Sequence, residues 1–404
     1  MLTRPLRLAR ASTFVFFALN GFLLSTWVVH IPAIEDRTGI THARLGWLLL
    51  LMGGGAVVAL QASGRLVDRF GSRRIVPAAG LFLAAAVIGP ALATNAWTLT
   101  VALILLGVGN GALDVAMNAH AVQVERGYAR PVMSAFHAVF SVGGVLASLA
   151  GAQAIARGWD LRLTLGCSAA FGAMTTLIAG TYLLQRERVP CRYEAVPTRK
   201  RRMPSHAWML GVPAFLLMLT EGVANDWSTL DLKDVLGAPP ATAALAYGAF
   251  STAMTTGRLL TDLVAARKGA IFIIHYGTAV AAVGLTTVAL SPWVPIALLG
   301  WTVFGIGLSG CVPQFFTAAG NVDRSFSGMN LSRVVGMGYL GLLAGPALIG
   351  ILTHVVPLNM AFFLPVGCCI AAGISARVLK TAPSQQSVST HSEDHPDLNP
   401  PWAS

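Results

Sequence analysis

The segment Leu105–Gln123 reads LLGVGNGALDVAMNAHAVQ and places polar side chains inside a long apolar run. Asn110, Asp114 and Asn118 follow one another at intervals of four residues, so on an α-helix they form one polar stripe. A carboxyl in the middle of an apolar membrane segment is costly, and it therefore marks a candidate functional site. We expect the other helices to surround this stripe so that it faces a water-filled cavity rather than lipid.

The composition is typical of a membrane protein. Of the 404 residues, 55% are hydrophobic and 11% are charged, and the mean hydropathy is +0.66, whereas a soluble domain has about 25% charged residues. This length accommodates roughly twelve membrane spans of about 20 residues each. The net charge of +11 is explained by basic loops on one side of a membrane, and nucleic-acid binding is not expected. The cysteines form no spaced pairs, so neither a disulfide framework nor a zinc site is expected.

Apolar segments divide the chain into twelve candidate transmembrane helices. Their predicted bounds are 11–34, 43–63, 76–94, 97–121, 131–156, 160–184, 207–229, 240–263, 270–289, 293–316, 330–354 and 357–379. An even number of spans puts both termini on one side of the membrane. The Lys and Arg residues left for the opposite side are only Arg37, Arg44, Arg157, Arg162 and Lys233.

This charge imbalance predicts that both termini lie in the cytoplasm, because loops rich in Lys and Arg stay on that side. The connections expected there are those around 65–75, 122–130, 185–206, 264–269 and 317–329. We expect a multi-pass protein of the bacterial inner membrane, in contact with the lipid bilayer and monomeric.

The chain consists of two similar halves. The sequence GRLVDRFGSRR begins at Gly64, and a related sequence, GRLLTDLVAARKG, begins at Gly257. Features that recur six helices later predict two pseudo-symmetric six-helix bundles. The expected domains are a first bundle at 1–184, a basic cytoplasmic linker at 185–206, a second bundle at 207–380 and a disordered cytoplasmic tail at 381–404.

The repeated sequence is also a family motif. The pattern G-x-L-x-D-R-x-G-x-R-R is matched by Gly64, Leu66, Asp68, Arg69, Gly71, Arg73 and Arg74. The second copy keeps Gly257, Arg258, Leu259, Asp262, Arg267 and Lys268. Over residues 11–380 the chain thereby resembles the major facilitator superfamily. The resemblance implies an all-α membrane protein with twelve transmembrane helices in two pseudo-symmetric six-helix bundles.

Two further stretches narrow this resemblance. DVAMN at Asp114–Asn118 resembles the fucose-permease branch, and EGVANDWS from Glu221 resembles the bacterial YbjJ-type permeases. The sugar permeases also carry an acid in the first helix, and this chain has none between Ser12 and Ile34. The arginine early in helix four and the glycine-proline signature in helix five, which drug antiporters tend to carry, are absent too.

The resemblance implies that the repeated motif forms a gate on the cytoplasmic side. We expect Asp68 to pair with Arg126, or with Arg333 and the helix N-terminus near Asn330. Asp262 would pair with Arg130 in the pseudo-symmetric position. The other candidate gating residues are Gly64, Arg69, Gly71, Arg73, Gly257 and Arg258.

Polar residues concentrate in the first, fourth, seventh and tenth spans, which line the central cavity in this superfamily. The candidate substrate-binding residues are Asn20, Trp27, Asn110, Asn118, Asn225 and Gln314. Asp114 and Glu221 are the candidates for proton coupling, because desolvation disfavours the charged form of a carboxyl. Asp114 would carry the proton, and Glu221 would bind solute or act as a second carrier. Alternatively, Asp114 is a structural hydrogen-bond partner between helices.

These features predict a secondary transporter that works by alternating access, with three hypotheses for its activity. The first is proton-coupled uptake of a small polar, sugar-like solute, which the cavity amides favour because polar solutes need paired hydrogen-bonding groups. The second is proton-driven efflux of a drug-like or apolar compound. The third is a non-transporting receptor or a membrane enzyme on the same scaffold. Motifs for ATP binding, zinc hydrolysis and serine hydrolysis are absent, so we expect no enzyme activity, cofactor or metal.

Overall fold

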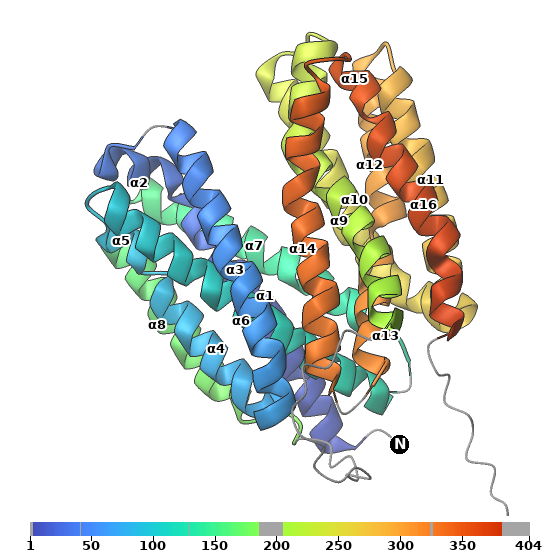
Figure 1. The fold of residues 1–404 in the computed structure, drawn as a ribbon. Coiled ribbons are helices and arrows are strands. Elements are labelled where there is room, and N and C mark those ends of the chain that lie inside the picture. The colour runs from blue at the N-terminus through green and yellow to red at the C-terminus, as the bar shows by residue number, and fades with distance from the viewer. Residues whose placement is uncertain (1–2, 41, 129, 186–204, 324–325, 382–404) are drawn as a thin grey trace, which may run out of the picture.

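The computed structural model describes residues 3–40, 42–128, 130–185, 205–323 and 326–381, which form an all-helical molecule of two bundles (Figure 1). The described residues contain helices and turns but no strand, and the predicted all-α fold is confirmed. Most of the predicted linker, residues 186–204, and the predicted tail after residue 381 lie outside the described residues.

The first bundle contains the helices of the N-terminal half. They are α1 (Arg4–Val29), α3 (His42–Phe70), α4 (Ser72–Ala86) with its continuation α5 (Gly89–Leu92), α6 (Ala96–Tyr128), α7 (Met133–Ala156) and α8 (Leu161–Gly180). The short helix α2 (Ile31–Thr38) follows α1. The residues of α1 from Ala9 to Trp27 include several fully buried side chains, among them Phe16 and Phe17, so α1 contributes much of the core of this bundle.

The second bundle contains the helices of the C-terminal half. They are α9 (Ser205–Leu230) with the π-helical turn η1 (Asp231–Val235), α10 (Pro240–Lys268), α11 (Ala270–Leu290), α12 (Val294–Leu308), α13 (Cys311–Asn321), α14 (Ser327–Leu352), α15 (Leu358–Ala361), α16 (Phe363–Ile374) and the 3-10 turn η3 (Ser375–Thr381). Within the described residues, 11 helical segments are long and apolar enough to cross a membrane, and α12 and α13 count as one of them. The helix α10 completes the set of twelve, because its 29 residues are long enough to span although they include Arg258 and Asp262.

The same close helix contact occurs in both bundles. In the first, a side chain at Gly143 of α7 would collide with the backbone carbonyl of Ala18 in α1. In the second, a side chain at Gly341 of α14 would collide with the backbone carbonyl of Phe215 in α9. Glycine lets two helix backbones approach closely in a membrane, where small residues mark the tightest contacts. The first and fifth long helices therefore pack alike in each half, as pseudo-symmetry requires.

The bundles touch at one end of the molecule and diverge toward the other (Figure 1). The N-terminus and the end of α16 lie at the end where the bundles touch, which we call the terminal face. The short helices α2 and α15 lie at the opposite end, the far face. Contacts between the bundles run mainly along α3 with α14 and along α7 with α10, and we call these two lines the α3/α14 seam and the α7/α10 seam.

Several predicted bounds were wrong, in most cases because the helices continue further than the apolar pattern. The first helix begins at Arg4 rather than at residue 11 and ends at Val29, with a proline in its first turn, where a missing N–H costs nothing. The predicted loops 65–75, 122–130 and 264–269 are mostly helix, since α3 reaches Phe70, α6 reaches Tyr128 and α10 reaches Lys268.

Two glycines mark where the motif helices end. Gly71 follows α3 with φ 83°, and Gly269 follows α10 with φ 86°. Glycine adopts a positive φ at little cost, so it stops a helix sharply. The motif residues from Gly64 to Asp68 and from Gly257 to Asp262 are thus held on rigid helix rather than on a loop.

Candidate functional site

The polar stripe of α6 is present and buried. Asn110, Asp114 and Asn118 are 6%, 7% and 0% exposed, respectively. The side-chain nitrogen Nδ2 of Asn118 donates to the backbone oxygen of Asp114 at 2.8 Å and lies 3.2 Å from its Oδ1. Because the nitrogen of Asn118 is engaged with Asp114, the group that Asn118 can offer to a ligand is its acceptor oxygen Oδ1.

Four buried side-chain oxygens, three on this stripe and one on α1, have no hydrogen-bond partner among the described residues. They are Oδ1 of Asn20, Oδ1 of Asn110, Oδ2 of Asp114 and Oδ1 of Asn118. All belong to α1 and α6 of the first bundle. A buried acceptor without a donor costs about 1–3 kcal/mol, so this group of oxygens is suited to a molecule that brings hydrogen-bond donors.

The second bundle brings Tyr339 and Glu221 to the same region. The hydroxyl of Tyr339, on α14, interacts with Asn110 and Asp114 across the bundle interface. Tyr339 also interacts electrostatically with Glu221, on α9. The two predicted coupling carboxyls are therefore connected through a tyrosine that sequence analysis missed. A single tyrosine in an apolar span is common at membrane depth, and only its position opposite Asp114 distinguishes it.

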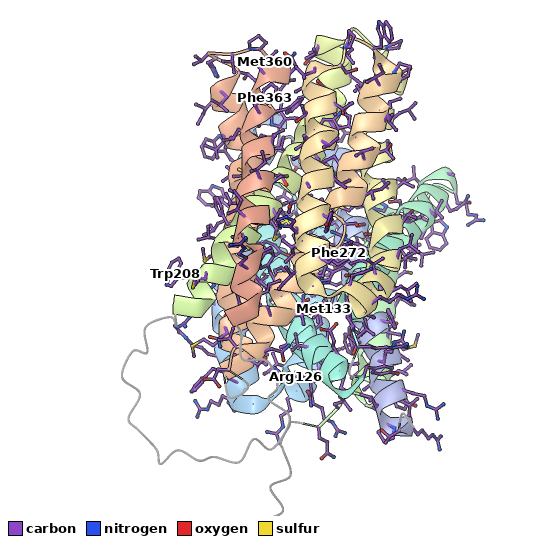
Figure 2. All side chains as sticks on the ribbon, turned by 90° about the vertical axis from the view of Figure 1, so that its right-hand side faces the viewer. Arg126, Met133, Trp208, Phe272, Met360 and Phe363 are labelled. Carbon is purple, nitrogen blue, oxygen red and sulfur yellow. The ribbon has the colours of Figure 1, made fainter. Side chains whose placement is uncertain are left out.

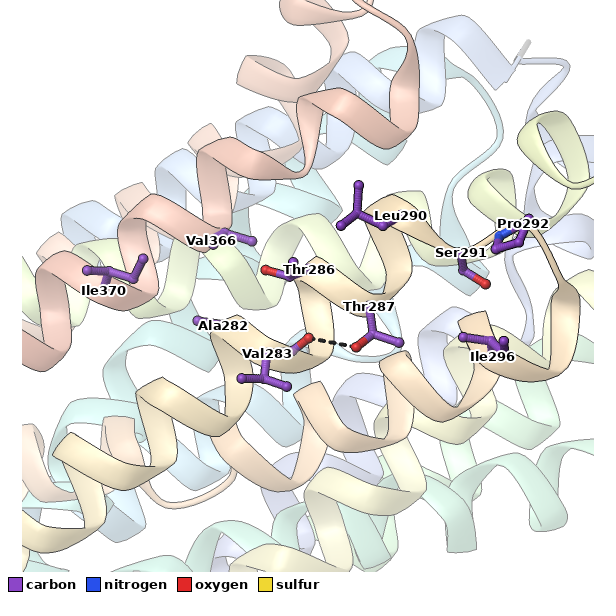
Figure 3. Close-up of a pocket in the computed structure, with 10 residues that line it drawn as sticks. All are labelled: Ala282, Val283, Thr286, Thr287, Leu290, Ser291, Pro292, Ile296, Val366 and Ile370. Atoms are coloured by element: carbon purple, nitrogen blue, oxygen red, sulfur yellow. Dashed lines mark hydrogen bonds between the residues drawn. The ribbon is translucent and has the colours of Figure 1, made fainter.

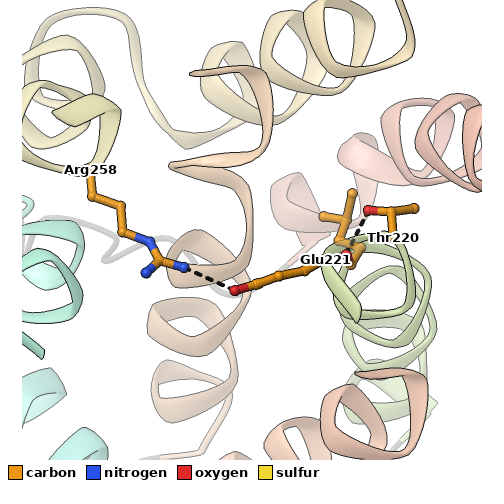
Figure 4. A network of polar contacts seen from close by, with 4 residues as sticks. Thr220, Glu221 and Arg258 are labelled. Atoms are coloured by element: carbon orange, nitrogen blue, oxygen red, sulfur yellow. Dashed lines mark hydrogen bonds and ion pairs between the residues drawn. The ribbon is translucent and has the colours of Figure 1, made fainter. Parts of the chain in front are cut away.

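Glu221 forms an ion pair inside the second bundle. Its Oε1 lies 3.4 Å from Nη2 of Arg258 on α10, and the side chains are 19% and 12% exposed (Figure 4). Sequence analysis assigned Arg258 to the gate because it belongs to the second motif copy. The structure instead gives it a partner among the site residues, and its Nε has no hydrogen-bond partner among the described residues.

Aromatic rings adjoin this ion pair. The ring of His137, on α7, lies 5.2 Å from the ring of Phe17 and 5.9 Å from the ring of Phe316. His137 also interacts electrostatically with Arg258, and its Nε2 is buried without a partner in the described part of the chain. Gln314, on the same helix as Phe316, is 6% exposed. The arrangement combines flat apolar surfaces with hydrogen-bonding groups, as sites for small polar ligands do.

Two predicted substrate-binding residues lie apart from this cluster. Trp27 is 1% exposed and belongs to the core of the first bundle. Asn225 is exposed on α9, and its neighbour Trp227 donates its ring N–H to the backbone oxygen of Pro346 at 3.2 Å. Both residues were selected because the first and seventh spans line the cavity in the superfamily, and their roles in solute binding stay predictions.

The α3/α14 seam contains the predicted contact of Asp68. The two carboxylate oxygens accept the backbone N–H groups of Gly328 and Met329 at 2.7 and 2.8 Å, at the first turn of α14. Arg333, on the same helix, interacts electrostatically with Asp68. Gly64 lies one turn before Asp68, and a side chain there would collide with Ser332. The helix N-terminus and Arg333, predicted as one alternative for Asp68, are its neighbours.

The α7/α10 seam repeats this arrangement with a second acid. The carboxylate of Asp262 accepts the backbone N–H groups of Ser134 and Ala135 at 3.2 and 2.8 Å, in the first turn of α7. Glu125, at the end of α6, accepts the N–H groups of Val132 and Met133 at 2.7 and 2.9 Å. Two carboxylates, one from each bundle, therefore bind the N-terminus of α7, where the helix dipole favours negative charge.

The remaining gating candidates have other partners. Arg130, predicted for Asp262, lies over the ring of Tyr128 at 5.6 Å, and Asp262 interacts electrostatically with Arg10. Arg126, the alternative predicted for Asp68, donates to the side-chain oxygen of Asn321 and to the backbone oxygen of Gly320, and these two hydrogen bonds join the two bundles. The other candidate gating residues have these surroundings: Arg69 lies over the ring of Phe70, Gly71 ends α3, Arg73 is exposed on α4, and Gly257 packs against Ser309.

The pocket shown in Figure 3 lies elsewhere. It has a volume of about 500 Å³ and is lined by Ala282, Val283, Thr286, Thr287, Leu290, Ser291, Pro292, Ile296, Val366 and Ile370. Its lining is mostly apolar and includes exposed residues of the outer surface of the second bundle. The pocket contains none of the residues of the polar cluster, and we therefore define the candidate site by its polar contacts.

The side-chain view places the gate relative to the two ends of the molecule. Figure 2 shows Arg126 and Met133 in the terminal half and Met360 and Phe363 at the far face. Arg126 and the N-terminus of α7 thus mark the end where the bundles touch. Within the described residues, no group of three or more His, Cys, Asp or Glu side chains is placed to hold a metal ion.

Comparisons with known proteins agree with this architecture. The model of the Major Facilitator Superfamily matches residues 12–325. An uncharacterized MFS-type transporter of Yersinia pestis is 31% identical over 374 residues, covering 92% of this chain and 95% of its own.

Solved structures show the same fold at low sequence identity. The fucose:proton symporter FucP of E. coli, in its outward conformation, gives a TM-score of 0.75 at 15% identity and covers 93% of this chain and 99% of its own. The proton:xylose symporter XylE gives a TM-score of 0.72 at 12% identity, over 95% and 97% of the two chains.

Proposed function

Because this chain belongs to the major facilitator superfamily, we propose that it is a secondary transporter that takes up a small polyhydroxy solute together with protons. Transporters of this fold work by alternating access, in which two bundles rock about a site near the middle of the membrane. The structure has the parts that this cycle needs. A polar cluster lies between the bundles, the two seams close the terminal face, and the bundles are separated at the far face.

The group of unpartnered acceptor oxygens is the observation that carries the proposal. Asn20, Asn110, Asp114 and Asn118 present four buried oxygens that lack donors. Hydroxyl groups of a solute would supply those donors, and a solute without them would leave the oxygens unpaired, which discriminates strongly against apolar compounds. The rings of Phe17 and Phe316 beside His137 offer apolar surfaces for the C–H faces of such a solute.

Asp114 is the proposed proton carrier, and Glu221 the proposed solute ligand or second carrier. Asp114 is 7% exposed and lies near the middle of the 33-residue helix α6. Protonation would turn its carboxyl from an acceptor into a donor and change what Asn118 and Tyr339 can offer the solute. Binding and proton loading would then depend on each other, which is the requirement for coupled transport.

The side of the membrane to which the site opens follows from the orientation that we propose. The terminal face would be cytoplasmic, because the exposed Arg73, Arg74, Arg267 and Lys268 lie at the ends of helices there. The described conformation would then be outward-open, with both seams closed toward the cytoplasm. FucP, whose outward conformation has the same fold, is itself a fucose:proton symporter. We propose a monomer in the bacterial inner membrane.

A ligand panel tests the class of solute. Purified protein in detergent would be heated with hexoses, pentoses, inositols and linear alditols, and in parallel with lipophilic cations. A true ligand at about 100 times its Kd stabilises the folded state by about 2.7 kcal/mol, which is a measurable rise in Tm. We expect one group of polyhydroxy compounds to raise Tm and to be accumulated by proteoliposomes with an inward proton gradient. Stabilisation by lipophilic cations alone would contradict the proposal and favour efflux.

A further inference from the structure

Arg258 pairs with a carboxylate of the polar cluster and precedes by four residues a second carboxylate on α10, that of Asp262, which interacts electrostatically with Arg10. On one side, its Nη2 is 3.4 Å from Oε1 of Glu221 in the polar cluster (Figure 4). On the other side, Asp262 follows it by four residues on α10, a spacing at which side chains of a helix are neighbours. The Nε of Arg258 has no hydrogen-bond partner in the described part of the chain, so the guanidinium keeps a free donor.

Of the two carboxylates, Glu221 and Asp262, only Asp262 bonds to the other bundle. Its carboxylate accepts the N–H groups of Ser134 and Ala135 at the first turn of α7, in the other bundle. A carboxylate that caps a helix N-terminus makes charge-assisted hydrogen bonds and interacts with the positive end of the dipole. An arginine that paired with Asp262 would compete for the same oxygens and weaken this link between bundles.

The α3/α14 seam carries Arg65 at the motif position that corresponds to Arg258, but the spacing to the acid differs, because the second motif copy has one more residue before Asp262. There, Asp68 caps the first turn of α14, and the residue four positions before it is Gly64. Gly64 allows α3 and α14 to approach closely, since its missing side chain leaves room for Ser332. Four positions before Asp262, α10 carries Arg258, which also interacts electrostatically with His137 of α7. In both seams an aspartate caps a helix N-terminus. The residue four positions before that aspartate is glycine in one seam and arginine in the other.

We propose that Arg258 connects the polar cluster to the gate by exchanging partners. It pairs with Glu221 while the terminal face is closed, and it turns to Asp262 when solute hydroxyl groups occupy the Glu221 carboxylate. The exchange withdraws Asp262 from the N-terminus of α7 and frees the α7/α10 seam to open. The identity of the trigger rests on the proposed function, but the exchange itself is a property of three side chains and occurs without solute when Glu221 is neutralised.

The exchange predicts effects of opposite sign for two substitutions that break the same ion pair. Glu221→Gln leaves Arg258 free to compete for Asp262, so the terminal face opens more often. Arg258→Gln removes the competitor, so Asp262 keeps its cap and the terminal face stays closed. The double variant Glu221→Gln/Arg258→Gln should behave like Arg258→Gln. If the ion pair had only a packing role, both single substitutions would loosen the structure in the same direction.

Distances between the bundles test this directly in solute-free protein. Spin labels would be placed at Arg74→Cys, at the start of α4, and at Lys268→Cys, at the end of α10, in a background without native cysteines. Both positions are exposed at the terminal face. Pulsed electron–electron resonance then gives the populations of the close and the separated state. For Glu221→Gln we expect the ratio of separated to close to rise by roughly five-fold or more, the lower end of typical coupling between sites.

Matched variants distinguish the partner exchange of Arg258 from a general loss of folding. Asp226→Asn removes an exposed acid from the same helix as Glu221 and should leave the distances unchanged. Asp262→Asn removes the cap itself, and adding Glu221→Gln to it should produce no further opening. An unchanged distribution in Glu221→Gln, or opening in Arg258→Gln, would overturn the proposal. Since no solute or pH gradient is used, the result is independent of whether polyhydroxy compounds are the substrates.

Discussion

The carboxylate of Asp68 lies 2.8 Å from the backbone nitrogen of Met329, although 261 positions of sequence separate the two residues. The same side chain accepts the N–H of Gly328 at 2.7 Å. One acid of the first bundle thus satisfies two of the N–H groups that the first turn of a helix leaves free in the second bundle. Because these bonds exist only while α3 and α14 are adjacent, they stabilise one state of the transport cycle and are lost in the other.

Replacing Asp68 by asparagine should open the terminal face. The amide keeps one acceptor oxygen but loses the charge, and hydrogen bonds to charged groups contribute roughly 1.5–3 kcal/mol. A loss of about 1.4 kcal/mol changes the ratio of two states about tenfold, so Asp68→Asn should shift the spin-label populations by at least that factor. Asp160→Asn is the control, because Asp160 caps α8 inside one bundle and accepts the N–H of Arg162 at 2.8 Å. Equal shifts in both variants would refute the role of Asp68.

Gly64 should tolerate no side chain in the closed state of the terminal face. A Cβ at Gly64 would collide with Ser332 and with the carbonyl oxygen of Gly328, whereas a Cβ at Gly54 on the same helix has nothing within 4 Å. We expect Gly64→Val to move the populations toward the separated state and to reduce uptake, and Gly54→Val to have little effect on either. Normal uptake by Gly64→Val would mean that α3 and α14 need not approach this closely.

Trp27 should contribute to stability rather than to solute binding. It is 1% exposed in the core of the first bundle, whereas Trp97 is 81% exposed. Replacing a buried ring by a smaller one leaves a cavity, so Trp27→Phe should lower the free energy of unfolding by roughly 1–2 kcal/mol, and Trp97→Phe should not. The apparent Kd for the stabilising solute should stay within about twofold. If Trp27→Phe lost much of its affinity for the solute without a fall in Tm, Trp27 would be a solute-binding residue.

The sequence was sufficient to predict the fold and one part of the site. Apolar segments with a polar stripe at Asn110, Asp114 and Asn118 indicated helices with one wet face, and the repeated Gly64 and Gly257 motifs indicated two related bundles. These are local patterns, and local patterns determine which residues share a helix face. For Asp68 the sequence left two alternatives, Arg126 or Arg333 with the helix N-terminus near Asn330, and the second includes the backbone contacts that Asp68 makes.

The partners within the site could not be predicted, because they depend on how distant helices face each other. Arg258 was assigned to the gate by its place in a motif, yet it pairs with Glu221, 37 positions earlier. Glu125 was not selected at all, although it shares the N-terminus of α7 with Asp262. Tyr339 contacts Asp114 from the other bundle. Each contact depends on the angle and the faces at which two helices pack. Hydrophobic periodicity does not predict this packing geometry for helices far apart in sequence.

Cysteine labelling tests the proposed orientation in whole cells. Asp234 in η1 and Asn95 before α6 are exposed near the far face, whereas Arg74 and Lys268 are exposed at the terminal face. A membrane-impermeant maleimide should label Asp234→Cys and Asn95→Cys in intact cells, and should label Arg74→Cys and Lys268→Cys only after permeabilisation. The opposite pattern would reverse the orientation, and the described conformation would then be open toward the cytoplasm.

Asp114→Asn is the most direct test of the proposal that Asp114 couples protons to solute movement. Two kinds of transport are compared in proteoliposomes: accumulation driven by an inward proton gradient, and exchange of labelled for unlabelled solute without a gradient. The solute is the polyhydroxy compound that gives the largest rise in Tm. Asparagine keeps the shape of the side chain but cannot ionise, and Asp226→Asn is the matched control. We predict that Asp114→Asn loses accumulation while exchange continues. Accumulation against a gradient with unchanged pH dependence in Asp114→Asn would show that the proton is carried elsewhere.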